Sequence, residues 1–320
     1  MIHHDEVTWA YRMLLGREPE SEVVLNHYAT QLGSRQALRA LFMQSAEFDE
    51  AVQQLPARSK PAALTGPAMA VQMDAAPDKL EALFDKISQQ WHHLGDTEPH
   101  WSVLTSQSYL QSNIQDSARS FYASGVSELA VFDATLARVG LAGRHFATCV
   151  ELGCGVGRVT AALAQRCDQV WGVDISASHL QLAAAHMAEQ GLVNVHLHQA
   201  MGVDGVAPVP SFDLLYSRIV LQHNPPPVMH RMLALLLQRL SSGGVAYFQV
   251  PTYHAGYRFS IEEYLAAENT TSMEMHYLPQ HELFKLVAQC NCQVLEVRED
   301  DAIGSARHAV SNTLLLKKMG

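Results

Sequence analysis

Basic residues are scarce in this sequence, and long apolar segments are missing. Its 22 Lys and Arg stand against 32 Asp and Glu, so the formal net charge is -10 at pH 7, and Lys and Arg form no cluster. Most of the affinity of proteins for nucleic acids comes from Lys and Arg side chains that neutralise phosphates. Because this chain has no basic cluster, we expect no DNA or RNA partner. No stretch approaches the roughly 20 apolar residues of a membrane-spanning helix. The N-terminus also lacks the basic and apolar regions of an export signal, and we expect a cytoplasmic protein.

Cysteine is scarce as well. The chain has five, an odd number, and Cys290 and Cys292 lie only two apart, which matches neither a disulfide framework nor a zinc site. Histidine is frequent instead, with 17 copies, but pairs such as His92-His93 join no cysteine or carboxylate in a ligand spacing. We therefore expect reduced cysteines, scattered histidines and no functional metal.

The middle of the chain holds a glycine-rich stretch. Residues 151–158 read Glu-Leu-Gly-Cys-Gly-Val-Gly-Arg, between an apolar run at 146–150 and helical spacing at 159–164. This order predicts a strand, a glycine loop and a helix. Glycine has no Cβ and tolerates positive φ, so such a loop can approach a ligand closely. Free amides in the first helical turn favour an electron-rich group there.

The spacing of these glycines disfavours a dinucleotide. A dinucleotide fingerprint has the form G-x-G-x-x-G, and Arg158 stands where its third glycine would fall. Glu151, two residues before the first glycine, would repel a pyrophosphate but suits a cationic ligand. A nicotinamide-dependent oxidoreductase is therefore the weakest of the enzyme hypotheses.

The pattern E-x-G-x-G-x-G, followed by the strand-like run 169–174, resembles the first two motifs of class I S-adenosylmethionine-dependent methyltransferases. The resemblance implies a loop backbone along the methionine moiety, an Asp174 that accepts hydrogen bonds from both ribose hydroxyls, and an Ile175 against the adenine. An N-cap role for Asp174 is the alternative. The cofactor S-adenosyl-L-methionine would then contact Glu151, Gly153, Cys154, Gly155, Gly157, Asp174, Ile175, Gln199, Ala200, Met201 and Ser217.

One position departs from the family pattern. The family often has an Asp just after the third strand, near the adenine amino group, and this chain has Met201 at that place. Gln199 or a backbone group could substitute, because an amide oxygen can accept from an exocyclic amine.

Strand and helix patterns alternate after the glycine loop. Strand-like runs at 194–200, 212–217 and 245–250 are separated by helical segments, one opened by Ser176 and closed by Gly191, another from 227 to 240 before a Ser-Ser-Gly-Gly turn. This alternation predicts an α/β fold, a Rossmann-like, doubly wound, mostly parallel sheet. A helix near 279–289 and two runs at 293–297 and 312–316 predict a C-terminal antiparallel hairpin.

The N-terminal part of the chain has a different character. Residues 1–50 predict a small all-α module, residues 51–77 a Pro- and Ala-rich linker, and residues 78–320 the methyltransferase domain, with helices at 78–142 and the Rossmann-like core at 143–320. Residues 11–19 and 45–48 resemble a short helical domain appended to bacterial glycosyltransferases and other glycan-assembly enzymes. The module could recruit a protein partner, or it could serve only stability or association.

Catalytic and substrate residues are expected after the fourth and fifth strands, because residues beyond the carboxyl ends of the strands face the ligand crevice. His223 is the leading candidate for a general base, and its alternative role is to fix the loop through backbone hydrogen bonds. Residues 252–278 predict a lid. The other catalytic candidates are His254 and His276, the substrate candidates are Gln222, Tyr253, Tyr257 and Arg258, and the aromatic candidates for the pocket wall are Trp101, Tyr109, Phe121 and Tyr122.

These observations favour a methyltransferase that acts on a hydroxyl of a sugar, a glycan precursor or another small polar molecule. The acceptor rests only on the resemblance of the N-terminal module. The alternative is a non-catalytic cofactor-binding or scaffold component of a glycan-assembly complex.

Overall fold

The computed structural model describes residues 2–48, 50, 65–206, 209–268, 272–304 and 308–320. The chain divides into two compact units, Met1–Pro61 and Ala62–Gly320, and each is described by itself. Residues 51–64, the first part of the predicted linker, lie outside the described residues.

The N-terminal unit is helical, as predicted. Its elements are α1 (His4–Ala10), the π-helical turn η1 (Tyr11–Leu15), α2 (Glu22–Gln31) and α3 (Arg35–Met43). The aromatic rings of Tyr11, Tyr28 and Phe42 pack edge to face at its centre. Ser34 begins α3, because its side chain accepts a hydrogen bond from the Ala37 amide.

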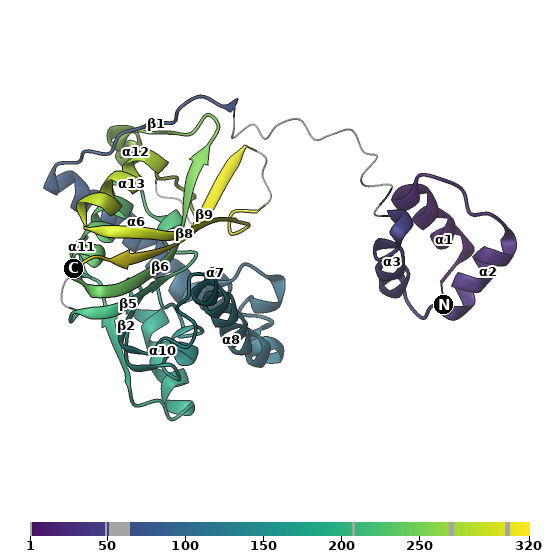
Figure 1. Cartoon of the computed structure of the whole chain (residues 1–320), viewed down its shortest axis with the longest axis horizontal. Coiled ribbons are helices and arrows are strands. Elements are labelled where there is room, and N and C mark those ends of the chain that lie inside the picture. Colours follow the sequence, from purple (N-terminus) through teal and green to yellow (C-terminus); the bar gives the residue numbers. More distant parts are fainter. Residues whose placement is uncertain (1, 49, 51–64, 207–208, 269–271, 305–307) are drawn as a thin grey trace. The chain divides into compact units, whose positions relative to one another are not determined.

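The second unit is built on a seven-stranded sheet (Figure 1). In spatial order its strands are β4 (Val195–Gln199), β3 (Cys167–Asp174), β2 (Phe146–Leu152), β5 (Phe212–Ser217), β6 (Leu240–His254), β9 (Ala309–Lys318) and β8 (Cys292–Asp300). The first five strands pair in parallel, and β9 runs antiparallel to both β6 and β8. The predicted doubly wound sheet with a C-terminal antiparallel hairpin is therefore confirmed.

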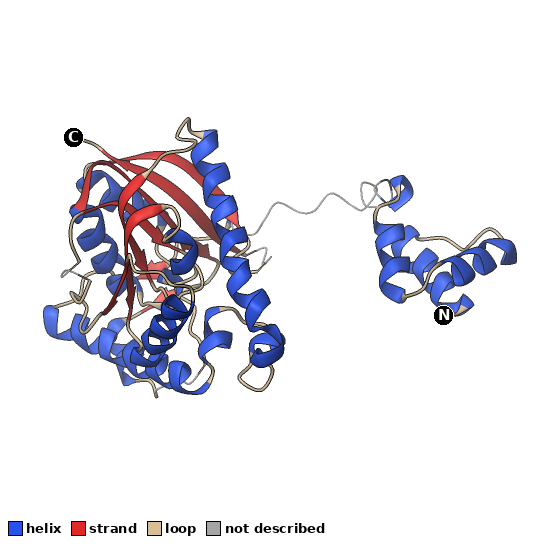
Figure 2. Ribbon diagram, turned by 90° about the horizontal axis from the view of Figure 1, so that it is seen from below, coloured by secondary structure: helices blue, strands red, loops and turns tan. Residues whose placement is uncertain are grey.

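Helices pack against both faces of this sheet (Figure 2). Successive strand residues face opposite sides, so Leu215 of β5 joins one apolar cluster while Leu214 and Tyr216 join the other. The helices of this unit are α6 (Pro77–Thr97), α7 (Pro99–Val103), η2 (Gln107–Tyr109), α8 (Ile114–Arg138), α9 (Thr160–Leu163), α10 (Ala177–Glu189), η3 (Leu221–His223), α11 (Pro226–Arg239), α12 (Ile261–Ala266) and α13 (Gln280–Gln289). Within the described residues, no helix combines the length and the apolar character that a bilayer crossing requires.

Two segments differ from the sequence expectation. The predicted turn at residues 241–244 is the beginning of β6, because the pairing of β5 with β6 shifts register there and Gly243, at φ +75°, accommodates the irregularity. The end of the predicted linker forms the strand β1 (Ala70–Val71), which pairs in parallel with β7 (Arg258–Phe259) inside the predicted lid. The amide of Gln72 donates to the Phe259 carbonyl at 3.0 Å and continues this pairing.

Candidate active site

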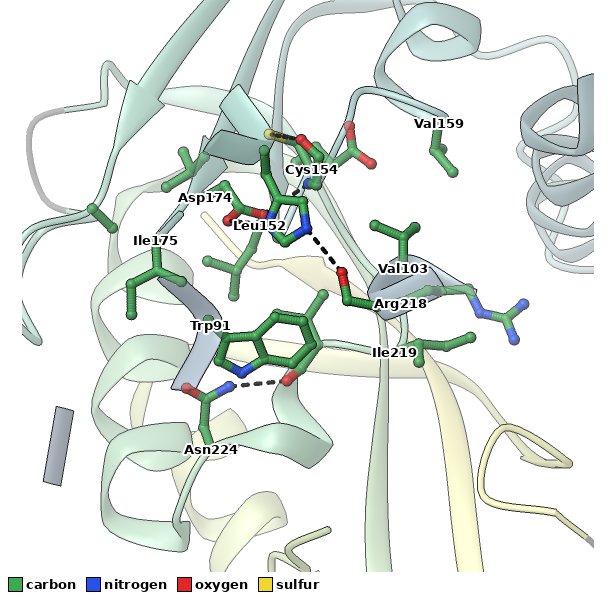
Figure 3. A pocket seen from close by; sticks show the side chains of 18 of the residues that line it. Trp91, Val103, Leu152, Cys154, Val159, Asp174, Ile175, Arg218, Ile219 and Asn224 are labelled. Carbon is green, nitrogen blue, oxygen red and sulfur yellow. Dashed lines mark hydrogen bonds and ion pairs between the residues drawn. The ribbon is translucent and has the colours of Figure 1, made fainter. Parts of the chain in front are cut away.

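A cavity that is partly open to solvent lies at the carboxyl ends of β2, β3 and β5. The glycine loop and the end of β3 form one side, and α6, α7 and the segment after β5 form the other (Figure 3). Ligands bind at this edge of open α/β sheets. Of the residues predicted to hold a cofactor, those lining the cavity are Glu151, Gly153, Cys154, Gly155, Asp174, Ile175 and Ala200.

The glycine loop folds back onto the next strand. The amides of Gly153 and Cys154 both donate to the Val173 carbonyl, at 2.7 and 3.0 Å. Gly153 has φ +72°, and a Cβ there would lie 2.2 Å from a methyl carbon of Val220. Gly155 has φ +52°, and its Cβ would lie 2.6 Å from a methyl carbon of Val103. Only glycine fits both the backbone conformation and the space, so the side of the cavity made by this loop is bare backbone.

Asp174 ends β3 with its carboxylate in the cavity wall. One oxygen accepts from the Gly155 amide at 2.8 Å and the other from the Ser176 amide at 2.9 Å. The N-cap of α10 is Ser176, whose hydroxyl oxygen accepts from the His179 amide, so Asp174 is not that cap. Each carboxylate oxygen keeps further acceptor capacity. The carboxylate can therefore accept hydrogen bonds from ligand hydroxyls.

Glu151 lies at the base of the loop and is buried. The Thr160 hydroxyl donates to its carboxyl group at 2.6 Å. Burial raises the pKa of Glu151 to about 8, while Thr160 and Arg158 oppose the shift. Burial therefore favours the protonated form at pH 7, and a cationic ligand would favour the ionised form.

Four of the predicted cofactor residues lie outside the cavity wall. Met201 is 78% exposed. Gln199 donates to the Ile175 carbonyl at 3.2 Å, and the Ser217 hydroxyl donates to the Leu152 carbonyl, also at 3.2 Å. Gly157 serves helix packing, because its Cβ would meet the side chain of Met187 in α10.

The three predicted catalytic histidines are also not among the residues that line the cavity. The Nδ1 of His223 donates to the Glu274 carbonyl at 2.8 Å, and its Nε2 lies 3.2 Å from the Gln222 amide nitrogen. Burial lowers the pKa of His223 to about 4. We therefore do not assign the base to His223, and the backbone hydrogen bond matches its alternative role.

His276 and His254 lie in the segment that was expected to form a lid. His276 contacts the Tyr257 hydroxyl at 2.8 Å and the Glu274 carboxylate at 3.3 Å, and the His254 ring packs on Tyr277. The predicted substrate residues Gln222, Tyr253, Tyr257 and Arg258 do not line the cavity either.

The aromatic wall of the cavity comes from a different residue than expected. Trp91 of α6 lines it, and its ring meets His223 edge to face at 5.2 Å. Trp101, Tyr109, Phe121 and Tyr122 are not among the lining residues. The alternation of apolar residues along α6 could have indicated a buried face, but not which aromatic residue reaches the cavity.

Sequence reasoning missed two arginines and a histidine. Arg158 and Arg218 line the cavity, and so does His179, whose Nδ1 lies 3.8 Å from an Asp174 oxygen. A signal for Arg218 exists in the sequence, because it is a charged residue between the apolar strand β5 and the apolar residues that follow. Among the residues that the structure describes, no three His, Cys, Asp or Glu side chains form a group suited to a metal ion.

A comparison with protein families bears on the part of this unit that forms the cavity. Residues 149–244 match the family model described as "Methyltransferase domain". The match begins in β2 and runs through the glycine loop, Asp174 and the Arg218 segment to β6. Residues 149–244 are thus similar to a methyltransferase domain, and they lie in a Rossmann-like sheet.

Particular relatives share part of this region. A trans-aconitate 2-methyltransferase of Deinococcus radiodurans is 44% identical over 115 residues, which make up 35% of this chain and 40% of that protein. A ubiquinone biosynthesis O-methyltransferase of Pseudomonas fluorescens is 32% identical over 112 residues, 35% of this chain and 46% of that protein. The chain therefore spans less than half the length of these relatives. The solved magnesium protoporphyrin IX methyltransferase of Synechocystis with bound S-adenosylmethionine has a TM-score of 0.49 and 15% identity, over 77% of this chain and 99% of that one.

Proposed function

We propose that this protein transfers a methyl group from S-adenosylmethionine to an oxygen atom of a small polar molecule. The observation that carries the proposal is the joint placement of the bare glycine loop and the Asp174 carboxylate in one cavity. The names of the curated relatives, a trans-aconitate methyltransferase and an O-methyltransferase of ubiquinone biosynthesis, support a small-molecule acceptor.

The residues present fit this cofactor. A Cβ at Gly153 or Gly155 would fill the space along the loop. The Asp174 carboxylate can accept from the two ribose hydroxyls, and Ile175 offers an apolar contact to the adenine. Glu151 lies where a cationic amino group would approach the loop. When bound, the cofactor supplies an activated methyl group on a sulfonium.

The chain's own contribution is to position the reactants. Displacement at a methyl carbon requires that the acceptor atom, the methyl carbon and the leaving sulfur lie in line. A site that holds both reactants in this geometry can supply most of the rate acceleration. Leu152, Trp91 and Val103 give the cavity apolar walls that exclude water from one side. A sugar or glycan acceptor, a protein partner of residues 1–50 and a cytoplasmic location stay predictions from the sequence.

Calorimetric titration tests the proposal. The full chain is titrated with S-adenosylmethionine, S-adenosylhomocysteine and NADH. We expect micromolar binding of the first two and none of NADH. Absence of binding by either adenosyl compound would overturn the proposal, and NADH binding alone would favour an oxidoreductase.

A second candidate is a cofactor-binding component without catalysis. It is favoured by one observation, that none of the three predicted catalytic histidines lines the cavity. Release of S-adenosylhomocysteine from S-adenosylmethionine in the presence of an acceptor would exclude it. Tight cofactor binding without any such release across neutral and acidic acceptors would favour it.

A further inference from the structure

Two guanidinium groups and one carboxylate meet at the wall of the cavity. Arg218, directly after β5, pairs with Glu128 of α8 through Nη1 and Oε1 at 2.7 Å. The Nη2 of Arg158 lies 3.9 Å from the other oxygen of Glu128. Both arginines line the cavity. One carboxylate thus faces two cations, and no second carboxylate among the described residues lies within ion-pair distance of either guanidinium.

Glu151 forms no ion pair with either arginine in the part of the chain that the structure describes. Its carboxyl group is committed to the Thr160 hydroxyl, and its burial raises its pKa to about 8. Asp174, the other acid in the cavity wall, accepts from the amides of Gly155 and Ser176.

The same wall carries buried polar atoms without partners. The Nε of Arg158, the Nε of Arg218 and the hydroxyl of Tyr216 make no hydrogen bond to the described residues. Neither does Oε1 of Glu128, whose contact with Arg218 is an ion pair. The side chain of Arg158 is 8% exposed, that of Arg218 is 15% exposed, and Tyr216 is 1% exposed. Buried donors are nearly always satisfied in native proteins, so three on one wall point to a polar ligand.

The backbone at Arg218 is held in an unusual conformation. Ile219 has φ +58°, which is rare for a β-branched residue and costs free energy. Its amide donates to the side-chain oxygen of Gln249 at 3.1 Å, and Gln249 in turn donates to Ser311 at 2.7 Å. These hydrogen bonds hold the strained turn in one conformation, and they therefore fix the position of the Arg218 backbone.

The arginine wall lies away from the adenine side. Figure 3 shows Ile175 and Arg218 on opposite sides of the cavity, with Asp174 and Leu152 between them. If Ile175 contacts the adenine, the side with Arg218 is left for the methyl acceptor.

We propose that the methyl acceptor carries a carboxylate, which the guanidinium groups of Arg158 and Arg218 bind at this wall. The inference rests on the proposed function. A carboxylate brings the single negative charge that the wall lacks, and its two oxygens match the planar fork of a guanidinium. A phosphate monoester brings nearly two negative charges, which is more than the one positive charge by which the two arginines exceed Glu128. Val103, Val159 and Ile219 supply apolar contacts for the carbon skeleton.

Calorimetry on the full chain saturated with S-adenosylhomocysteine tests this site. The probes are succinate, citrate and glucuronate, with succinamide, triethyl citrate and glucose as neutral counterparts, and inorganic phosphate. We expect at least one carboxylate to bind at least tenfold more tightly than its neutral counterpart and than phosphate. Arg218→Gln should weaken that carboxylate at least tenfold and leave the affinity for S-adenosylhomocysteine within twofold of wild type.

Two further variants keep the test decisive. Arg218→Lys retains the positive charge but loses the planar guanidinium and its Nε. Its carboxylate affinity should lie between those of wild type and Arg218→Gln. Arg231→Gln is the matched control, because Arg231 pairs with Asp204 on the surface and is not among the cavity-lining residues, and it should change nothing. If Arg218→Gln fails to bind S-adenosylhomocysteine, Arg158→Gln is measured in its place. Loss of S-adenosylhomocysteine binding in both variants would assign the two guanidinium groups to the carboxylate of the cofactor itself and overturn the proposal.

The outcomes separate the two proposals. Failure of the wild-type chain to bind S-adenosylhomocysteine removes the proposed function. Intact binding of S-adenosylhomocysteine with no carboxylate bound, with equal binding of a neutral counterpart, or with tighter binding of phosphate overturns the carboxylate site alone.

Discussion

Two polar regions lie at the carboxyl edge of the same sheet, and they differ in how their hydrogen bonds are completed. Around the cavity, Arg158, Arg218 and His179 each have a buried nitrogen without a partner among the described residues. In the neighbouring region, His223 and His276 each have both ring nitrogens engaged. The first region has unmet hydrogen-bonding capacity that a ligand can use, whereas His223 and His276 have none left. His254, in the same segment as His276, still has a buried Nδ1 without a hydrogen-bond partner among the described residues.

This difference teaches that position in the fold does not separate a site from a structural network. Both regions follow the ends of parallel strands, where ligands bind in open α/β sheets. The count of unmet donors and acceptors does separate them, because a buried polar atom without a partner costs free energy that a ligand can recover. The predictions below test the contrast, first in the cavity region and then in the histidine region.

Replacement of Asp174 should have the largest effect. Asp174→Ala removes the acceptor for the cofactor hydroxyls and leaves the amides of Gly155 and Ser176 without partners. Two charge-assisted hydrogen bonds to a ligand are worth about 3 kcal/mol or more, so affinity for S-adenosylhomocysteine should fall at least 100-fold. Calorimetry measures this loss, with circular dichroism as the check on folding. Unchanged affinity would show that the carboxylate does not hold the ribose.

The pH dependence of stability should reveal Glu151. Its pKa of about 8 in the folded chain lies above the ordinary value of 4.5, so the native state binds more protons than the unfolded state between these values. The stabilisation from this group is therefore present at low pH and is lost as pH rises to about 8, by about 5 kcal/mol in total. Glu151→Gln keeps an acceptor for the Thr160 hydroxyl and should lack this loss. Urea unfolding at pH 5 and pH 8 measures both curves, and parallel curves would contradict the assignment.

A pair of glycine variants separates crowding from backbone conformation. Gly153 and Gly143 have nearly the same φ, +72° and +70°, but a Cβ meets Val220 at 2.2 Å only at position 153 and nothing within 4 Å at position 143. Gly143→Ala should cost about 1 kcal/mol of unfolding free energy through its φ alone. Gly153→Ala should cost about 2 to 3 kcal/mol, since overpacking adds to that strain, and should weaken S-adenosylhomocysteine as well. Equal costs would mean that the loop relaxes around the added methyl group.

The sequence predicts the cavity's loop side better than its other side. The strand, glycine loop and Asp174 lie within about 25 residues, so their spacing alone carries the geometry, and Ser176 caps α10 as expected. The opposite wall joins Trp91, Val103 and Arg218 from three separate segments, and Glu128, which pairs with Arg218, comes from a fourth. No local pattern reports which distant side chains meet there. No local pattern reports the contact at His223 either, since the Glu274 carbonyl that accepts its hydrogen bond lies 51 residues away.

Replacement of His223 should have the smallest effect on the cofactor. Its nitrogens are engaged by Glu274 and Gln222, and it is not among the cavity-lining residues. His223→Asn should therefore leave the affinity for S-adenosylhomocysteine within about threefold of wild type, which is less than 1 kcal/mol. The small remaining change would pass through Trp91, whose ring packs on the histidine.

The dependence of unfolding free energy on pH below about 6.5 distinguishes His223→Asn from the variants in the cavity. Burial lowers the pKa of His223 to about 4 from an ordinary 6.5, so the unfolded state binds the extra proton between these values. Its contribution is present above pH 6.5 and is lost as pH falls toward 4, by about 3 kcal/mol, opposite in direction to Glu151. His223→Asn should flatten this acid limb in urea unfolding while Glu151→Gln leaves it intact. A large loss of cofactor affinity in His223→Asn, with an unchanged acid limb, would place the histidine in the cavity region after all.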